Sequence, residues 1–295
     1  IGQTGTALLA ISILIYFEFK FSVVVIGYLS SFLVGSILAA IFIIRLGGLE
    51  GYSSPQFDFQ RVLVFSLPLV LAATGQYLAS WIDVLLLGYL RPAADIGYYH
   101  AAFQTSTILL LVLQSANSIF PSVAAEFYHS NKLVELQQIY TVVTKWTTYF
   151  TLFGSLFISI YSKHILSLFG NSFQFASVSL VVLSGGQLIV AAVGPAGYLL
   201  SMTEYERLEL LNVSVLALCN AILNFVLIQR YGVLGAAIAT SISLSLVNVL
   251  KLLEVWVLLE IQPYSRHYLK GILAVLSSIP AMVVGIRLPV SSISK

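Results

Sequence analysis

A succession of long apolar segments constrains this chain more than any other feature of its sequence. The segments cover about residues 3–18, 22–45, 62–90, 96–122, 140–162, 176–202, 207–229, 232–260 and 268–288. A helix crosses the roughly 30 Å hydrocarbon core of a bilayer in about 20 residues. The composition agrees, with 59% hydrophobic and 9% charged residues and a mean hydropathy of +0.96. We therefore expect an all-α polytopic membrane protein with about nine transmembrane helices.

Several classes of function are disfavoured by what the sequence contains. The formal net charge is only +2, and the basic residues are scattered, which is not the pattern of a nucleic-acid binder. The single cysteine, Cys219, rules out an internal disulfide and a cysteine-based metal site. The connections are short, and the sequence contains no phosphate loop, Gly-rich dinucleotide turn or nucleophile elbow. We expect no cofactor, no metal site and no enzymatic activity.

The segment from Arg61 to Arg91 combines an intramembrane charge with a helix-bending residue. Its length exceeds the hydrocarbon thickness, so the helix must tilt or bend, and Pro68 removes one backbone hydrogen bond inside it. Gln76, Ser80 and Asp83 share one helix face. A charge at the membrane centre costs about 2.5–3.5 kcal/mol on insertion scales, so we expect a coupling or gating role for Asp83. The alternative is an interfacial carboxylate that pairs with Arg91.

Two later segments carry polar residues on one helical face and are candidates to line a hydrated cavity. The fourth segment contributes His100, Gln104, Thr107, Gln114 and Ser118, and the fifth contributes Thr141, Lys145, Thr148, Ser155 and Ser159. The alternative for the Ser and Thr residues is hydrogen bonding between helices. Asn220, Asn224 and Ser241 are expected to make such interhelical bonds.

Local signals predict three further features of the chain. Gly194, Pro195 and Gly197 lie deep in the sixth segment and predict a helix break or a tight helix crossing. Residues 126–140 are interpreted as an amphipathic surface helix, and the cluster of Glu204, Glu206, Arg207 and Glu209 as a solvated loop and helix start.

A weak internal repeat suggests how the chain is divided. Residues 13–36 resemble residues 224–245, each with a helix, a short basic-aromatic turn, a glycine and a Ser-bearing helix. The spacing suggests lobes of about six helices: residues 1–48 as the last two helices of a truncated first lobe, and 61–262 as a complete second lobe. Residues 263–295 would add a C-terminal helix, whole or truncated. Because the chain opens at Ile1 on an apolar segment, we expect it to be a fragment of a longer protein.

Several motifs in this order resemble one family of membrane transporters. The motifs are RVLVFSLPLVL (61–71), WIDVLLLGYL (81–90), DIGYYHAA (95–102), NSIFPSVA (117–124), GQLIVAAVGPAGYLLSM (186–202) and YGVLGAAIATSIS (231–243). Together they resemble the polysaccharide-biosynthesis flippases of the multidrug, oligosaccharidyl-lipid and polysaccharide exporter superfamily, over most of residues 55–265. The resemblance implies two six-helix lobes around a central cavity, with this chain corresponding to about helices five to thirteen and lacking the opening ones.

The resemblance implies that the protein moves a lipid-linked oligosaccharide, of polyprenyl-phosphate type, across the bacterial or archaeal cytoplasmic membrane by alternating access. The expected cavity residues are Arg61, Gln76, His100, Gln104, Gln114 and Lys145. Arg61 and Lys145 would meet the phosphate. Asp83, Pro68 and Pro195 would serve coupling or gating, with a proton or sodium as coupling ion. The alternatives are a cation-coupled multidrug antiporter of the same superfamily and, more remotely, a membrane-embedded polysaccharide polymerase.

Overall fold

A computed structural model describes residues 35–37, 41, 59–265, 268–278 and 280. Within residues 59–80 it describes the backbone throughout, but side chains only at positions 63, 67, 70, 71, 74 and 77. Contacts divide the chain into two compact units, Ile1–Phe59 and Gln60–Lys295. Almost all of the described residues belong to the second unit.

The described part of this unit is helical and contains no strand, in agreement with the all-α class expected from the sequence. Its helices are α3 (Phe59–Leu90), α4 (Ala93–Thr107), α5 (Leu111–Asn117), α6 (Phe120–His129), α7 (Leu133–Ser167), α8 (Ser177–Val193), α9 (Ala196–Met202), α10 (Glu206–Tyr231), α11 (Val233–Leu259) and α12 (Tyr268–Leu276), with 3₁₀ turns η1 (Ile108–Leu110) and η2 (Asn171–Ala176).

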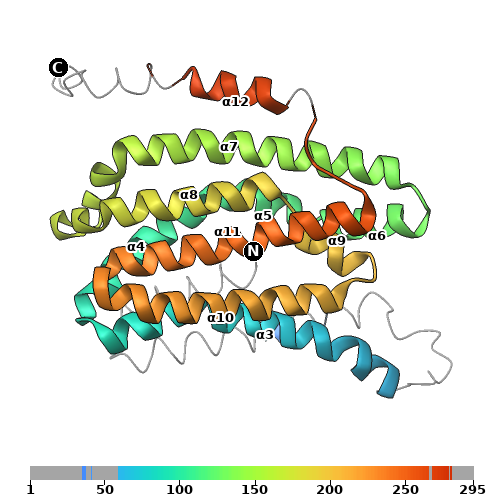
Figure 1. Ribbon diagram of the computed structural model, residues 1–295, viewed down its shortest axis with the longest axis horizontal. Helices are drawn as coiled ribbons and strands as arrows, with labels where there is room; N and C mark the ends of the chain where they lie inside the picture. Colours follow the sequence, from blue (N-terminus) through green and yellow to red (C-terminus); the bar gives the residue numbers. More distant parts are fainter. Residues whose placement is uncertain (1–34, 38–40, 42–58, 266–267, 279, 281–295) are drawn as a thin grey trace. The chain divides into compact units, whose positions relative to one another are not determined.

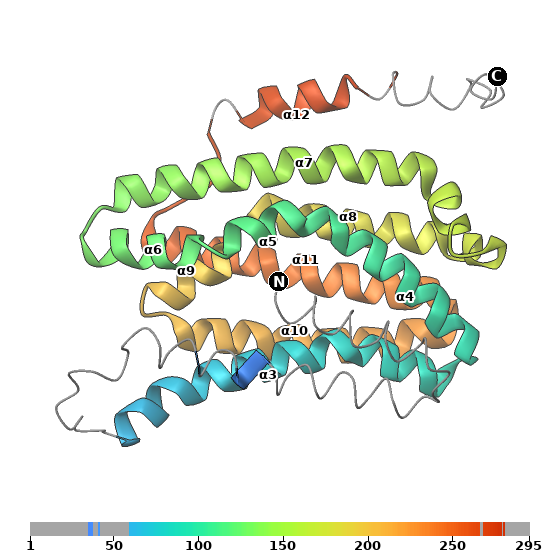
Figure 2. The same cartoon turned by 180° about the vertical axis from the view of Figure 1, so that it is seen from behind.

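Four helices lie side by side in the order α10, α11, α8 and α7 (Figures 1 and 2). The α10–α11 connection is a single tight turn at Gly232, whose φ of 57° is in the left-handed region. A Cβ atom at Gly235 would overlap the backbone of Leu227 and Ile228, so this glycine lets the start of α11 pack closely against the end of α10. Helix α12 packs against α7 (Figure 1).

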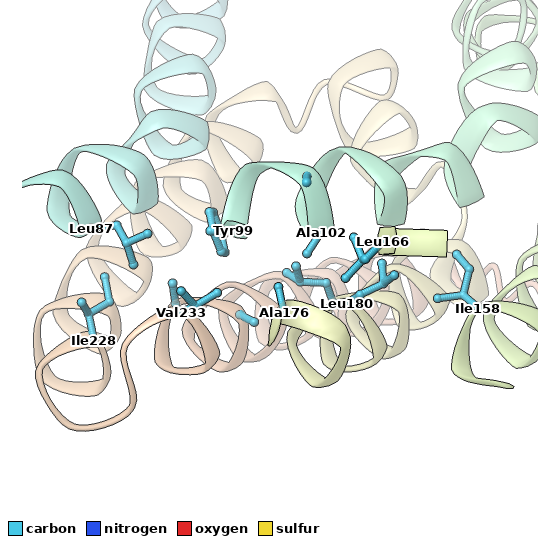
Figure 3. Close-up of a cluster of buried hydrophobic side chains, with 13 residues drawn as sticks. Leu87, Tyr99, Ala102, Ile158, Leu166, Ala176, Leu180, Ile228 and Val233 are labelled. Carbon is cyan, nitrogen blue, oxygen red and sulfur yellow. The ribbon is translucent and has the colours of Figure 1, made fainter. Parts of the chain in front are cut away.

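Two buried apolar clusters stabilise the unit. The first joins seven elements, from α3 to α11, and Figure 3 draws its side chains and labels Leu87, Tyr99, Ala102, Ile158, Leu166, Ala176, Leu180, Ile228 and Val233. The second gathers residues of α6, α7, α9 and α11, including Phe120, Tyr140, Leu199 and Val255. Within a bilayer such clusters stabilise the bundle through van der Waals packing between the helices, because lipid is as apolar as the side chains themselves.

Four helical stretches of the described residues are long and apolar enough to cross a membrane: Ala93–Asn117, Asn171–Val193, Glu206–Tyr231 and Val233–Leu259. Many of their large apolar side chains are exposed, for example Leu218, Ile222 and Leu246. Such surfaces suit contact with lipid. The chain is a multi-pass membrane protein.

The fourth predicted segment is not one helix. It is α4, the 3₁₀ turn η1 and α5, and α5 ends at Asn117 before α6 begins with Pro121 in its first turn. The hydroxyl of Thr151 on α7 donates a 3.0 Å hydrogen bond to the carbonyl oxygen of Leu109, which stabilises the distorted turn.

The predicted surface helix over residues 126–140 is wrong. Helix α6 ends at His129, and Asn131 adopts a φ of 57°, a conformation that Asn tolerates better than most residues. The amide of Lys132 donates a 2.8 Å bond to the carbonyl of Phe127, which closes the end of α6. The remaining residues are the first turns of α7.

Pro68 and Pro195, the two prolines with a predicted gating role, differ in their effect on the helices. Helix α3 is continuous across Pro68, so this proline does not end the helix. The break predicted at Gly194 and Pro195 is confirmed: α8 ends at Val193, Gly194 has a φ of 72°, and α9 begins at Ala196.

Candidate functional site

The carboxylate of Asp83 joins four helices inside the unit. Its side chain, on α3, is 2% exposed. It accepts hydrogen bonds from the hydroxyl of Tyr99 on α4 (2.6 Å), the amide of Asn224 on α10 (2.8 Å) and the hydroxyl of Thr240 on α11 (2.7 Å). Asn224 Nδ2 also lies 2.8 Å from Asn220 Oδ1. The predicted interhelical role of Asn224 is confirmed.

Three charge-assisted donors offset the loss of hydration that a buried carboxylate suffers. This arrangement contradicts the interpretation of Asp83 as an interfacial carboxylate, while its coupling or gating role stays a prediction. The residue does not pair with Arg91, because Arg91 Nε lies 3.3 Å from Asp95 Oδ2 at the exposed end of the α3–α4 turn. The carboxylate is instead buried among α4, α10 and α11.

The Asp83 site contains oxygen atoms suited to a hard cation or a proton. Besides the carboxylate, it contains Asn220 Oδ1 and Thr240 Oγ1, and Asn224 Oδ1 is buried with no hydrogen-bond partner. Rotation of the Asn224 amide would turn this oxygen toward Asp83, and oxygen ligands are those that hard cations prefer. The residues therefore fit a cation such as Na⁺.

A second polar feature stabilises the break between α8 and α9. The carbonyl oxygens that end α8 have no helical partners, and hydroxyl groups from elsewhere satisfy them. Tyr140 donates to Val193 (2.8 Å), while Thr148 lies 3.2 Å from the Ala191 oxygen and Tyr264 3.1 Å from that of Ala192. Partial burial raises the pKa of the Tyr264 phenol, which keeps it a donor. For Thr148, hydrogen bonding between helices is the interpretation that the contacts support.

A third polar feature was missed by sequence reasoning. The ammonium of Lys251 on α11 donates a 2.6 Å hydrogen bond to Glu209 Oε1 on α10, and Asn212 Nδ2 donates a 2.6 Å bond to Glu254 Oε2 between the same helices. The prediction that Glu209 is solvated is wrong, since its side chain is 14% exposed. The signal that could have found this pair is a lysine within an apolar span.

The structure brings together only two of the predicted cavity residues whose side chains it describes, His100 and Gln104. His100, Gln104 and Gln114 are exposed on α4 and α5, and His100 Nε2 lies 3.4 Å from Gln104 Nε2. Lys145 on α7 is half-buried, with Nζ 5.8 Å from the centroid of the Trp146 ring. The side chains of Arg61, Pro68 and Gln76 lie outside the described residues. The cavity that these residues would line together stays a prediction.

The fold and the site together define a class of protein. It is a polytopic α-helical membrane protein whose helix bundle encloses a hydrogen-bonded carboxylate. Residues 68–226 match the family described as MatE, and residues 3–126 match the family described as Polysaccharide biosynthesis protein. The chain belongs to the MatE family, within the multidrug, oligosaccharidyl-lipid and polysaccharide exporter superfamily that its motifs indicated.

Two similar proteins come from Haloferax volcanii. The chain is 30% identical over 231 residues to a protein named as a probable low-salt glycan biosynthesis flippase, Agl15, covering 74% of this chain and 48% of the relative. It is 28% identical over 177 residues to a probable flippase, AglR, covering 58% of this chain and 37% of the relative. The chain thus spans about half the length of these relatives or less.

A solved structure supports the fold. A lipid II flippase, MurJ, in an inward closed conformation, superposes with a TM-score of 0.62 at 17% sequence identity, covering 96% of this chain and 65% of that one. At this identity the likeness concerns the fold alone.

Proposed function

We propose that the protein is a flippase that moves a polyprenyl-phosphate-linked oligosaccharide across the cytoplasmic membrane for cell-surface polysaccharide or glycan assembly. The relative named as a probable low-salt glycan biosynthesis flippase supports a glycan substrate, and the relative named as a probable flippase supports the transport step. The unit Gln60–Lys295 would contain the second lobe and the helix that follows it. The two lobes would alternate access to a cavity between them. The chemistry is transport, and no covalent step is required.

The buried carboxylate of Asp83 is the observation that supports coupled transport. An ionisable group inside the membrane is costly, and here it is bound by three other helices at once. Uptake of a proton or a sodium ion would change the charge at the junction of α3, α4, α10 and α11. Because packed helices move as units, such a change can favour one arrangement of the helices over another.

Deletion of the gene in its host tests the flippase. We expect the surface glycan to be lost and the lipid-linked precursor to accumulate in the cytoplasmic leaflet. The full-length gene should restore export, whereas Asp83→Asn should restore little of it. Unchanged surface glycan and unchanged precursor in the deletion strain would contradict the proposal.

A second candidate is a cation-coupled multidrug antiporter, which the match of residues 68–226 to the MatE family favours. This activity would also use Asp83 but would export organic cations. Overexpression should then raise resistance to cationic dyes, and an inactive Asp83→Asn variant should not. Resistance without any effect on surface glycan would replace the flippase with the antiporter.

A further inference from the structure

A small pocket between α3 and α4 has a composition that matches a sugar ring. Its volume is about 130 Å³, and it is lined by Trp81, Val84, Tyr99, His100, Phe103 and Gln104. The Trp81 side chain is 44% exposed, and the rings of Tyr99 and Phe103 lie stacked, with centroids 5.9 Å apart. His100 and Gln104 form the polar edge, with their nitrogens 3.4 Å apart.

The chemistry of these side chains favours a neutral polyhydroxylated ligand. An aromatic face packs against the C–H face of a pyranose ring, while an amide and an imidazole supply both donors and acceptors for ring hydroxyls. None of the six lining residues is Lys or Arg, and the Asp83 carboxylate lies directly behind Tyr99. A phosphate would meet no counter-charge among these residues and a repulsive carboxylate behind them.

We propose that this pocket binds one monosaccharide ring of the glycan carried by the flippase, with Trp81 as the stacking platform and Gln104 and His100 as hydrogen-bonding groups. The inference rests on the proposed function for its substrate class. The small volume of the pocket, about 130 Å³, suits a single ring. The phosphate of the same substrate must bind elsewhere.

Tyr99 connects this pocket to the Asp83 site. Its ring lines the pocket, while its hydroxyl lies 2.6 Å from Asp83 Oδ2 and 2.9 Å from Thr240 Oγ1. A sugar that shifts the ring would change a hydrogen bond to the carboxylate, and a change of charge on Asp83 would alter the position of the ring. Sugar and coupling ion should therefore alter each other's affinity by the same factor.

Saturation-transfer NMR on the purified full-length protein in nanodiscs tests the pocket. The probes are free glucose, galactose, mannose and N-acetylglucosamine, with inorganic pyrophosphate for comparison. We expect saturable binding of at least one sugar, weakened roughly tenfold by Trp81→Ala and by Gln104→Ala, the size of a lost aromatic contact. Trp256→Ala and Gln138→Ala, which alter exposed residues away from the pocket, should bind as the wild type does.

The link to Asp83 is tested by repeating the titration at several sodium concentrations and pH values. The wild type should show a sugar affinity that depends on one of these ions. Tyr99→Phe keeps the ring and removes the hydroxyl, so it should bind sugar but lose the ion dependence. An ion dependence that survives in Tyr99→Phe would overturn the coupling through this residue.

The outcomes separate this inference from the proposed function. If no sugar binds, or if Trp81→Ala and Gln104→Ala bind as the wild type does, the pocket is not a saccharide site, even where gene deletion abolishes export. If sugar binding depends on the pocket but deletion leaves glycan export intact, the pocket stands and the flippase proposal falls. Binding of pyrophosphate in place of sugar, lost in Trp81→Ala, would overturn the assignment to a neutral ligand.

Discussion

Lys251 on α11 and Glu209 on α10 form an ion pair with an N–O distance of 2.6 Å. Their side chains are only 10% and 14% exposed. The pair lies against α9, because a Cβ atom at Gly197 would be 3.2 Å from Lys251 Nζ and 3.1 Å from the Glu209 carboxylate. The ion pair thus lies where α9, α10 and α11 meet.

Removal of one partner should destabilise the protein strongly. Lys251→Met leaves Glu209 buried without its cation, which costs about 3–5 kcal/mol for a pair of this kind. Thermal unfolding in detergent measures the effect. The double variant Glu209→Gln/Lys251→Met should recover much of the loss, since it leaves no unpaired charge. If the double variant loses as much stability as Lys251→Met and Glu209→Gln lose when added together, the two side chains are not energetically coupled.

Gly186 and Gly185 provide a matched pair for testing the α8–α11 contact. A Cβ atom at Gly186 would lie 2.9 Å from the Cα atom of Ser241, whereas one at Gly185 would meet nothing within 4 Å. Gly186→Ala should lower stability by about 1–3 kcal/mol through overpacking. Gly185→Ala should be neutral or raise stability by up to about 1 kcal/mol, the helix propensity of alanine over glycine. Equal melting temperatures for the two variants would contradict this helix crossing.

The cap on the α8 terminus is tested by Tyr140→Phe. The variant keeps the ring in its apolar cluster and removes the hydroxyl that satisfies the Val193 carbonyl. The expected loss of stability is about 1 kcal/mol, typical of hydrogen bonds in membrane proteins. Hydrogen exchange should also increase in the residues around Gly194. Tyr89→Phe, at a tyrosine that is 84% exposed, is the control and should change neither quantity.

The features that sequence predicts well are those set by local chemistry. The apolar length of residues 62–90 predicted α3, and Gly194 followed by Pro195 predicted the break after α8. Both depend on a few adjacent residues: a helix needs enough apolar side chains, and proline removes a backbone donor. Asn224 was recognised as an interhelical partner because a membrane amide needs one.

The features that sequence missed depend on residues far apart in the chain. Glu209 was assigned to solvent because its neighbours are charged, but its partner Lys251 is 42 residues away. Likewise, the donors to Asp83 come from Tyr99, Asn224 and Thr240, at separations of 16, 141 and 157 residues. Such pairings follow from how the helices pack, which periodicity within one helix does not specify. Trp81 was not singled out, because an aromatic residue within an apolar span carries no local signal that it lines a pocket.

Flipping of a fluorescent polyprenyl-phosphate-linked saccharide by the full-length protein in proteoliposomes tests the account most directly. The rate is measured with an imposed sodium gradient, a proton gradient or neither, for the wild type, Asp83→Asn and the control Asp95→Asn, whose carboxylate pairs with Arg91 at the surface. We predict that one gradient accelerates the wild type and Asp95→Asn, and that Asp83→Asn folds but does not respond to either gradient. A response of Asp83→Asn equal to that of the wild type would contradict the coupling role of Asp83.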